Sequence, residues 1–289
     1  MSERQMSSFE HVIEGRRHLV EAEECLRLNV IYEDVWINYP GADYILKLIG
    51  TFLRMPEKIQ APSVLVYGDP GIGKTALFQR IARTYGFSSG VEKCVACLTL
   101  AEENPENSKA FRSLVVRALT AGAYDNPNLA DETLLASIRS LNIKALAVDE
   151  LNDMLLCSAS EVRKNIRLLK KLSGRPFGLS VIGLGTADSE SVIGYEKQMD
   201  RRFEKIKLKP WQASEEFESF LASFEATLPL KYPSRLYSRR NINYLLKETD
   251  GILDEILKRI CNAAAYAILE GGEKITMDLL KKGERRPIF

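Results

Sequence analysis

The chain has 289 residues, 45% of them apolar, and its formal net charge is +1. This length and composition suit one large globular domain, or a large domain with a small one. The near-neutral charge excludes a protein that binds polyanions over its whole surface, so any contact with nucleic acid must come from local patches. No apolar run approaches the roughly 20 residues that span a bilayer, and the N-terminal residues are polar. We therefore expect a soluble intracellular protein with no membrane partner.

Five cysteines in a chain without an export signal predict free thiols rather than a disulfide framework. Cys94 and Cys97 have the spacing of a redox or zinc motif. They lie in a predicted strand, residues 91–100, where side chains three positions apart point to opposite faces. We interpret both as buried strand residues.

Residues 9–28 have the apolar spacing of a helix, which Gly15 weakens. The next segment, residues 37–43, contains Tyr39 and Pro40 and precedes a predicted helix at residues 44–53. Many ring-forming ATPases hold the adenine base with an apolar, proline-containing segment in this place. Tyr39 and Pro40 are therefore candidates for an adenine pocket, and a simple loop before a helix is the alternative.

A complete phosphate-binding loop follows. Residues 68–75 read Gly-Asp-Pro-Gly-Ile-Gly-Lys-Thr and fit G-x-x-x-x-G-K-[ST] at every fixed position. An apolar strand is predicted before it, at residues 63–67, and a helix after it, at residues 76–82. In this setting backbone N–H groups converge on phosphate oxygens at a helix N-terminus. We expect Lys74 to reach the β- and γ-phosphates of ATP and Thr75 to bind Mg²⁺, within a pocket formed by Asp69, Pro70, Gly71, Ile72, Gly73 and Ala76.

The pattern continues with a strand at residues 93–100, helices at 108–119 and 133–140, and a third strand at 144–148 that ends in Asp149-Glu150. An apolar strand with this ending, downstream of a phosphate-binding loop, is a Walker B motif. Asp149 would hold Mg²⁺ at the carboxyl edge of a parallel sheet. Glu150 would orient or deprotonate the attacking water.

A helix at residues 161–173 has an apolar face and recurrent basic residues at Arg163, Arg167, Lys170 and Lys171. Either the basic face is solvated, or it contacts phosphate or an acidic neighbour. The sequence leaves both readings open.

A fourth strand, residues 179–186, ends in Thr186, which is placed to sense the γ-phosphate or the attacking water. Arg201 and Arg202 precede a short fifth strand at residues 206–208. We expect Arg202 to act as an arginine finger toward a neighbouring subunit's γ-phosphate. Arg201 takes that role if the register differs by one residue, and an ordinary surface pair is the alternative.

From Ser214 onward only helices are predicted: one capped by Ser214, then residues 241–249, 252–269 and 276–282. The expected organisation is an N-terminal helical extension (1–29), an α/β nucleotide-binding domain (30–210), a small all-helical lid (211–283) and a mobile basic tail (284–289).

This layout is that of AAA+ ATPases, and within them the chain resembles the TniB/TnsC family of transposition regulators. The segments that carry the resemblance are residues 37–42, 67–75, 148–150, 183–186, 202–203 with 208–211, and 249–251, in the family's order. At the position where AAA+ lids usually carry a sensor arginine, this chain has Asp254 or Glu255, and Arg259 follows about one turn later.

The resemblance implies a bacterial, cytoplasmic ATPase that forms homo-oligomers or filaments on double-stranded DNA. Slow ATP hydrolysis would be coupled to their assembly and disassembly. It also implies two protein partners, a TniQ-type target selector and a DDE-type transposase. In this family the helix after the second strand faces the DNA backbone, which in this chain points to Lys109 and to Arg112.

Two other functions are compatible with the motifs. A general AAA+ loader or remodeller would act on a protein partner without binding DNA and would use its basic faces for subunit packing. A small-molecule P-loop kinase is a weaker candidate, since those enzymes carry their substrate lid inside the α/β part.

Overall fold

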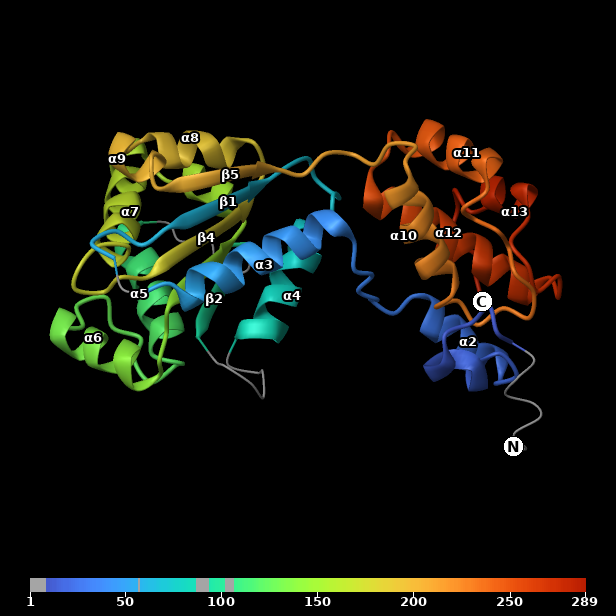
Figure 1. Cartoon of the computed structure of the whole chain (residues 1–289), viewed down its shortest axis with the longest axis horizontal. Helices are drawn as coiled ribbons and strands as arrows, with labels where there is room; N and C mark the ends of the chain where they lie inside the picture. Colours follow the sequence, from blue (N-terminus) through green and yellow to red (C-terminus); the bar gives the residue numbers. More distant parts are fainter. Residues whose placement is uncertain (1–8, 57, 87–93, 102–106) are drawn as a thin grey trace. The chain divides into compact units, whose positions relative to one another are not determined.

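The computed structural model describes residues 9–56, 58–86, 94–101 and 107–289. The chain forms two compact units (Figure 1). One is an α/β unit, Gly41–Lys209, and the other is a helical unit formed by the chain up to Pro40 together with Pro210–Phe289. Each is described below by itself.

The α/β unit is built on a five-stranded parallel sheet with the order β2-β3-β4-β1-β5. All five strands predicted from the sequence are present, although Lys93, expected to start the second, lies outside the described residues. Because the strands are parallel, their carboxyl ends meet at one edge of the sheet. The strand bounds are β1 (Ser63–Tyr67), β2 (Val95–Thr99), β3 (Ala145–Asp149), β4 (Ser180–Gly185) and β5 (Phe203–Lys207).

Helices connect the strands, as parallel pairing requires. The helices predicted within the α/β unit all form, with small shifts in their ends. Three helical segments were not indicated by the sequence: the 3-10 helix η2 (Leu151–Leu156), which follows β3, and the α-helices α8 (Asp188–Gly194) and α9 (Lys197–Asp200), which follow β4. The remaining helices are α3 (Pro40–Arg54), α4 (Lys74–Tyr85), α5 (Ser108–Leu119), α6 (Asp131–Ser140) and α7 (Ala159–Leu172).

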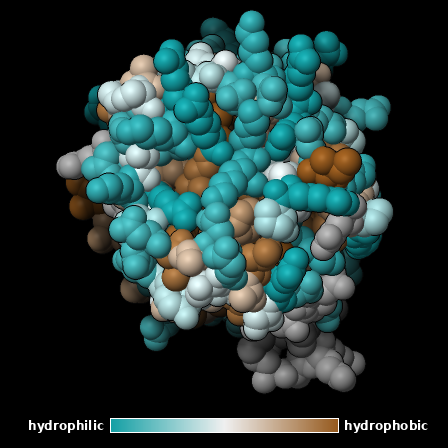
Figure 2. Space-filling view, turned by 90° about the vertical axis from the view of Figure 1, so that its left-hand side faces the viewer, coloured by the Kyte–Doolittle hydropathy of each residue, from teal (hydrophilic) through white to brown (hydrophobic). Residues whose placement is uncertain are grey.

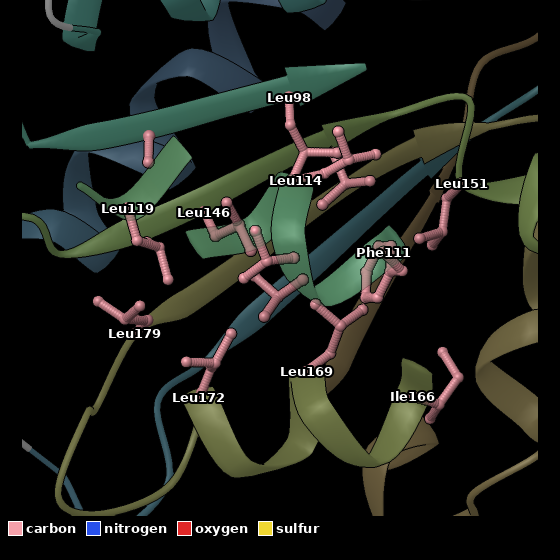
Figure 3. Packing of buried hydrophobic residues seen from close by; sticks show 14 of the residues in the cluster. Leu98, Phe111, Leu114, Leu119, Leu146, Leu151, Ile166, Leu169, Leu172 and Leu179 are labelled. Carbon is pink, nitrogen blue, oxygen red and sulfur yellow. The ribbon is translucent and has the colours of Figure 1, made fainter. Parts of the chain in front are cut away.

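The core of the α/β unit lies mainly between α5, α7 and one face of the sheet. Phe111 of α5 and Leu169 of α7 point toward the strand residue Leu146, and all three are at most 1% exposed (Figure 3). Strand neighbours alternate between the two faces. Leu65 therefore belongs to this cluster, whereas Val64 and Val66, also fully buried, face the opposite side, where α4 packs on the sheet.

The basic helix predicted at residues 161–173 is α7, and its two faces are as expected. Val162, Ile166 and Leu169 are buried in the core. Arg163, Arg167 and Lys171 are exposed on the other side.

The helical unit contains the predicted C-terminal helices. They are α10 (Glu215–Glu225), capped by Ser214 as expected, α11 (Arg239–Thr249), α12 (Leu253–Leu269) and α13 (Met277–Lys282). The break between α11 and α12 occurs at Asp250 and Gly251, which both have positive φ angles.

The N-terminal prediction of one helix over residues 9–28 is wrong. The segment forms a 3-10 helix, η1 (Glu14–Leu19), and a separate helix, α2 (Glu24–Ile31), with an extended residue, Glu23, between them. A tertiary contact competes with the helix, because the Ile13 N–H donates to the Ala226 carbonyl at 2.8 Å. Gly15 further lowers the intrinsic preference for a continuous helix.

A buried ion pair joins α2 to the C-terminal half of the helical unit. The guanidinium of Arg27 donates to both carboxylate oxygens of Glu273 and to the Pro229 carbonyl, and the two charged residues are only 5% and 7% exposed. Burial alone would raise the pKa of Glu273, but hydrogen bonding and charge from Arg27 outweigh it and lower the pKa. The described residues up to Pro40 are therefore structurally part of the helical unit.

The basic tail after Gly283 contacts the same unit. The Phe289 ring stacks on Tyr32 with centroids 6.2 Å apart, and the Arg286 guanidinium lies 4.5 Å from the centre of the same ring. Pro287 is buried, while Ile288 is fully exposed.

Candidate nucleotide-binding site

The loop between β1 and α4 has the backbone conformation that its glycines predict. Gly71 and Gly73 have φ angles of 72° and 100°, and α4 begins immediately afterwards at Lys74. A side chain at Gly68 is excluded, because its Cβ would lie 2.7 Å from the Leu208 carbonyl oxygen. Asp69, Pro70, Thr75 and Ala76 are exposed, and Ile72 is buried. The loop thus presents its backbone and a helix N-terminus to solvent, which is the arrangement that binds phosphate.

Lys74 lies beneath this loop. Its side chain is nearly buried, with the residue 5% exposed, and its Nζ donates to the carbonyls of Gly68 at 3.0 Å and Asp69 at 2.9 Å. Burial lowers the pKa of Lys74, and the nearby carboxylates of Glu150 and Asp149 oppose that shift. An ammonium held this way can exchange the carbonyl oxygens for those of a phosphate.

Asp149 ends β3 and is 2% exposed. Burial raises the pKa of its carboxyl to about 6, opposed by hydrogen bonds from the Glu150 N–H, at 3.0 Å, and the Thr75 side chain. The structure therefore brings together Thr75 and Asp149, which come from distant parts of the sequence. Two oxygen ligands on one side, with water and phosphate completing an octahedron, suit Mg²⁺, so the residues present fit this ion.

Glu150 has an unusual backbone conformation, with φ of 52° and ψ of 46°. A non-glycine residue in the left-handed region is strained, and such strain concentrates at functional sites. The side chain is half-buried at the carboxyl edge of the sheet, next to Asp149 and close enough to Lys74 to affect its pKa.

Thr186 follows β4 and is positioned by a residue that sequence reasoning missed. The Oδ1 of Asn152, in η2, accepts a hydrogen bond from the Thr186 N–H at 2.9 Å. The hydroxyls of Thr186 and Ser189 are both buried, and neither has a hydrogen-bond partner among the described residues. Gly185 leaves room for this group, since a Cβ there would lie 2.5 Å from the Asn152 Oδ1.

Thr186 is close to the phosphate-binding loop along the sheet, because Tyr67 and Gly185 are register partners in β1 and β4. A buried hydroxyl without a partner at this edge can receive or donate a hydrogen bond to a ligand. Neither Asn152 nor Ser189 belongs to a recognisable motif, so neither could be found from the sequence.

The two arginines before β5 differ in their surroundings. Arg202 donates from Nη1 to the Lys170 carbonyl at 3.2 Å and to the Ser173 hydroxyl at 2.6 Å, both at the end of α7. Arg201 is exposed and has no side-chain hydrogen bond or ion pair within the part of the chain that the structure describes. The guanidinium of Arg202 is thus engaged within its own subunit.

In the sequence, Tyr39 and Pro40 are the last two residues of the N-terminal part of the helical unit, and the α/β unit begins at Gly41. The Tyr39 ring packs edge-on against Trp211 at 5.2 Å and against Phe220 at 6.3 Å, inside the helical unit. Burial raises the pKa of its hydroxyl to about 12. Pro40 is exposed and begins α3. In the same unit, Arg259 donates to the Tyr244 hydroxyl at 3.0 Å.

The two residues expected to meet DNA also differ. Lys109 is exposed in the first turn of α5, with no side-chain ion pair to any described residue. Arg112 instead donates to the carbonyls of Pro127 and Leu129 and pairs with Asp131 at 3.4 Å. Its guanidinium fixes the loop before α6.

No helix among the described residues is long and apolar enough to cross a membrane. These residues also contain no group of three or more His, Cys, Asp or Glu side chains placed to hold a metal ion. Cys94 is buried and Cys97 half-buried, and burial raises the pKa of the Cys97 thiol to about 12, as expected for unreactive core residues.

Comparison with known proteins agrees with this geometry. The model of the family described as bacterial TniB protein matches residues 27–213. No curated protein sequence matches the chain.

Similar folds occur among solved structures of ORC and Cdc6 proteins. The Aeropyrum pernix ORC2 protein, in ADPNP and ADP complexes, has a TM-score of 0.60 and 17% identity, covering 88% of this chain and 70% of that one. The A. pernix ORC1 protein in complex with DNA has a TM-score of 0.57 and 14% identity, with coverage of 89% and 68%. Cdc6p from Pyrobaculum aerophilum has a TM-score of 0.55 and 15% identity, covering 88% of this chain and 69% of that one. These likenesses confirm the predicted fold, an α/β domain with a parallel sheet flanked by helices and accompanied by a helical region.

Proposed function

The chain belongs to the bacterial TniB protein family, and from that premise we propose that it assembles on double-stranded DNA in an ATP-dependent manner and links a target-selecting protein to a DDE-type transposase. It is an AAA+ ATPase by family and fold. The single observation that carries the proposal is the convergence of Lys74, Thr75, Asp149 and Glu150 at the carboxyl edge of the sheet.

Each residue of this group has a role in hydrolysis. Lys74 would leave the loop carbonyls to bind the β- and γ-phosphates. Thr75 and Asp149 would hold Mg²⁺, which neutralises charge on the phosphates. Glu150 would hold the attacking water in line with the γ-phosphate and accept its proton. The unpartnered Thr186 hydroxyl, whose backbone Asn152 fixes, would bond the γ-phosphate or that water.

Assembly requires a contribution from a second copy. An arginine finger stabilises charge on the γ-phosphoryl group in the transition state. Of the two candidates, Arg201 is exposed, and Arg202 already holds the end of α7. These contacts favour Arg201 for the finger and give Arg202 the task of fixing the segment before β5 to the end of α7.

The adenine base and the lid are further parts of the proposal. Tyr39 and Pro40 remain our candidates for contacts to the base, since they stand where the α/β unit begins in the sequence. Arg259 is the candidate for a lid arginine, and its bond to Tyr244 would have to be exchanged for one to phosphate.

DNA binding is supported by exposed basic residues on α5 and α7, among them Lys109 and Arg167. It is also supported by similar proteins that are described as bound to DNA, the A. pernix ORC1 protein and the Drosophila ORC. The contacts we propose are to the phosphate backbone, which positions a protein without reading sequence.

One observation favours the alternative of a remodeller that acts on protein. Acidic residues of the same subunit already pair with Arg112, Lys164 and Lys171 and reduce the charge available to DNA. Fluorescence anisotropy with duplex DNA separates the two functions. We expect affinity that falls steeply with added salt, as phosphate neutralisation requires. Absence of binding at low salt, with ATP present, would leave the remodeller.

A further inference from the structure

A cavity of about 510 Å³ opens between α5 and α7, away from the phosphate-binding loop. Figure 2 shows the side of the α/β unit on which α6, α7 and α9 lie, where hydrophobic residues are visible in hollows among mostly hydrophilic ones. The side chains of the cavity that bear a positive charge are Lys109, Arg112, Lys164, Arg167 and Lys171. Its volume falls within the range of pockets that bind small molecules.

Asn165 lies in the wall of this cavity and is 1% exposed. Neither its Nδ2 nor its Oδ1 has a hydrogen-bond partner among the described residues. Buried amide groups almost always have partners, because an unpaired one loses its bonds to water without replacement. The adjacent buried positions of α7, Val162 and Leu169, are apolar core residues. An unpaired amide at this position is therefore unfavourable for folding. A ligand that forms hydrogen bonds with it would explain why asparagine stands there.

The charges around the cavity leave two cations without an acidic partner. Asp131 pairs with Arg112 and Lys171, and Glu161 pairs with Lys164. Both carboxylates stay ionised, since hydrogen bonds from Lys171 lower the pKa of Asp131 and those from Lys164 and Ser108 lower the pKa of Glu161 to about 2. Lys109 and Arg167 have no ion pair to any residue that the structure describes. The cavity is therefore positive and open to an anion.

The chemistry of Asn165 narrows the choice of anion. Its amide offers two donors and one acceptor in a plane. A carboxylate or a phosphate can only accept hydrogen bonds and would leave the Oδ1 unpaired. The edge of a nucleobase carries donors and acceptors side by side, and asparagine pairs with such edges. The phosphate that the sugar links to that base would meet Lys109 and Arg167.

We propose that the cavity between α5 and α7 binds one nucleotide unit, with its base against Asn165 and its phosphate against Lys109 and Arg167. This inference rests on the proposed function, because the expected source of the unit is a nucleic-acid strand. A paired base cannot enter, since it must first leave the stack. The cavity would therefore favour DNA that contains an unpaired nucleotide, such as a gap or a distorted site, over a perfect duplex.

The test is fluorescence anisotropy of the full chain with a non-hydrolysable ATP analogue and Mg²⁺ saturating the phosphate-binding loop. The probes are a perfect duplex and the same duplex with a short unpaired stretch. The variants are Asn165→Leu, which keeps similar volume without the amide, and Arg167→Ala, an exposed change that leaves folding intact. Lys144→Ala, an exposed lysine at the amino end of β3, is the matched control for charge.

We expect the wild type to bind the unpaired probe about tenfold more tightly, the equivalent of one or two hydrogen bonds. Asn165→Leu should remove this preference and keep affinity for the perfect duplex. Arg167→Ala should weaken both probes several-fold more than Lys144→Ala does. Competition by AMP that is lost in Asn165→Leu would confirm the cavity and identify free nucleotide as its occupant.

A wild type that binds both DNA probes equally and is indifferent to AMP would overturn the proposal, as would an unchanged preference in Asn165→Leu. These outcomes leave the proposed function intact. Failure of the wild type to bind any DNA is a separate result that contradicts the proposed function itself. Thermal melting checks folding, and Asn165→Leu should melt no lower than the wild type, since it removes an unpaired buried amide.

Discussion

Replacing Arg202 and Arg201 by alanine, one at a time, should separate a structural arginine from a catalytic one. Arg202 makes two hydrogen bonds to the end of α7, at 3.2 and 2.6 Å. Hydrogen bonds of charged groups contribute about 1.5–3 kcal/mol each when buried. Because this guanidinium is only partly buried and its Nε has no partner among the described residues, we take about 2 kcal/mol for both together.

For a domain of this size, 1 kcal/mol shifts Tm by about 2–4 °C, so Arg202→Ala should lower Tm by about 4–8 °C. Arg201→Ala removes an exposed side chain and should change the free energy of unfolding by no more than about 0.5 kcal/mol. In the assay, melting is followed by intrinsic fluorescence, and ATP turnover is measured against protein concentration with DNA present.

Arg201→Ala should keep ATP binding and lose the concentration-dependent turnover by about a hundredfold or more, as expected for an arginine finger. Arg202→Ala should show both the lower Tm and a smaller loss of turnover. The reasoning fails if Arg202→Ala melts with the wild type and alone abolishes turnover. That result would make Arg202 the finger, as the sequence first suggested.

Three other substitutions test the site and the helical unit. Lys74→Ala should abolish nucleotide binding, because the β- and γ-phosphates lose their cation; calorimetry with ATP that shows unchanged affinity would contradict this role. Glu150→Gln should bind ATP, cleave it at least about a hundredfold more slowly, and accumulate assemblies, whereas wild-type turnover would exclude Glu150 as the base. Glu273→Gln should destabilise the chain by about 3 kcal/mol at pH 7, since Arg27 is left buried without its counter-charge. The pKa of Glu273 is lowered by folding, so the wild type should lose this advantage as the pH falls below about 4.5. Equal melting curves of the wild type and Glu273→Gln at pH 7 would refute a stabilising contribution of the ion pair.

Local motifs explain why the centre of the site could be predicted. The conformations of Gly71 and Gly73 and the positions of Lys74 and Thr75 follow from one continuous stretch of sequence. Asp149 could be predicted because an apolar strand that ends in a carboxylate has few other roles beside such a loop. Parallel pairing then places both segments at the same edge of the sheet.

Residues that act through tertiary contacts could not be predicted. Asn152 positions Thr186 across 34 residues of sequence, and no motif connects them. The Arg202 side chain turns toward its own subunit because the carbonyl it bonds, that of Lys170, is freed at the end of α7. Likewise, the break in the predicted N-terminal helix and its place in the helical unit depend on contacts with residues more than 200 positions away, at Ala226 and Glu273.

The central claim is that ATP, bound between copies of this chain, drives its assembly along DNA. Electron microscopy of the purified protein with duplex DNA and a non-hydrolysable ATP analogue tests it most directly. We predict regular oligomers or filaments on the DNA, absent with ADP and absent for Lys74→Ala. Particles that remain monomeric with every nucleotide, with and without DNA, would contradict it.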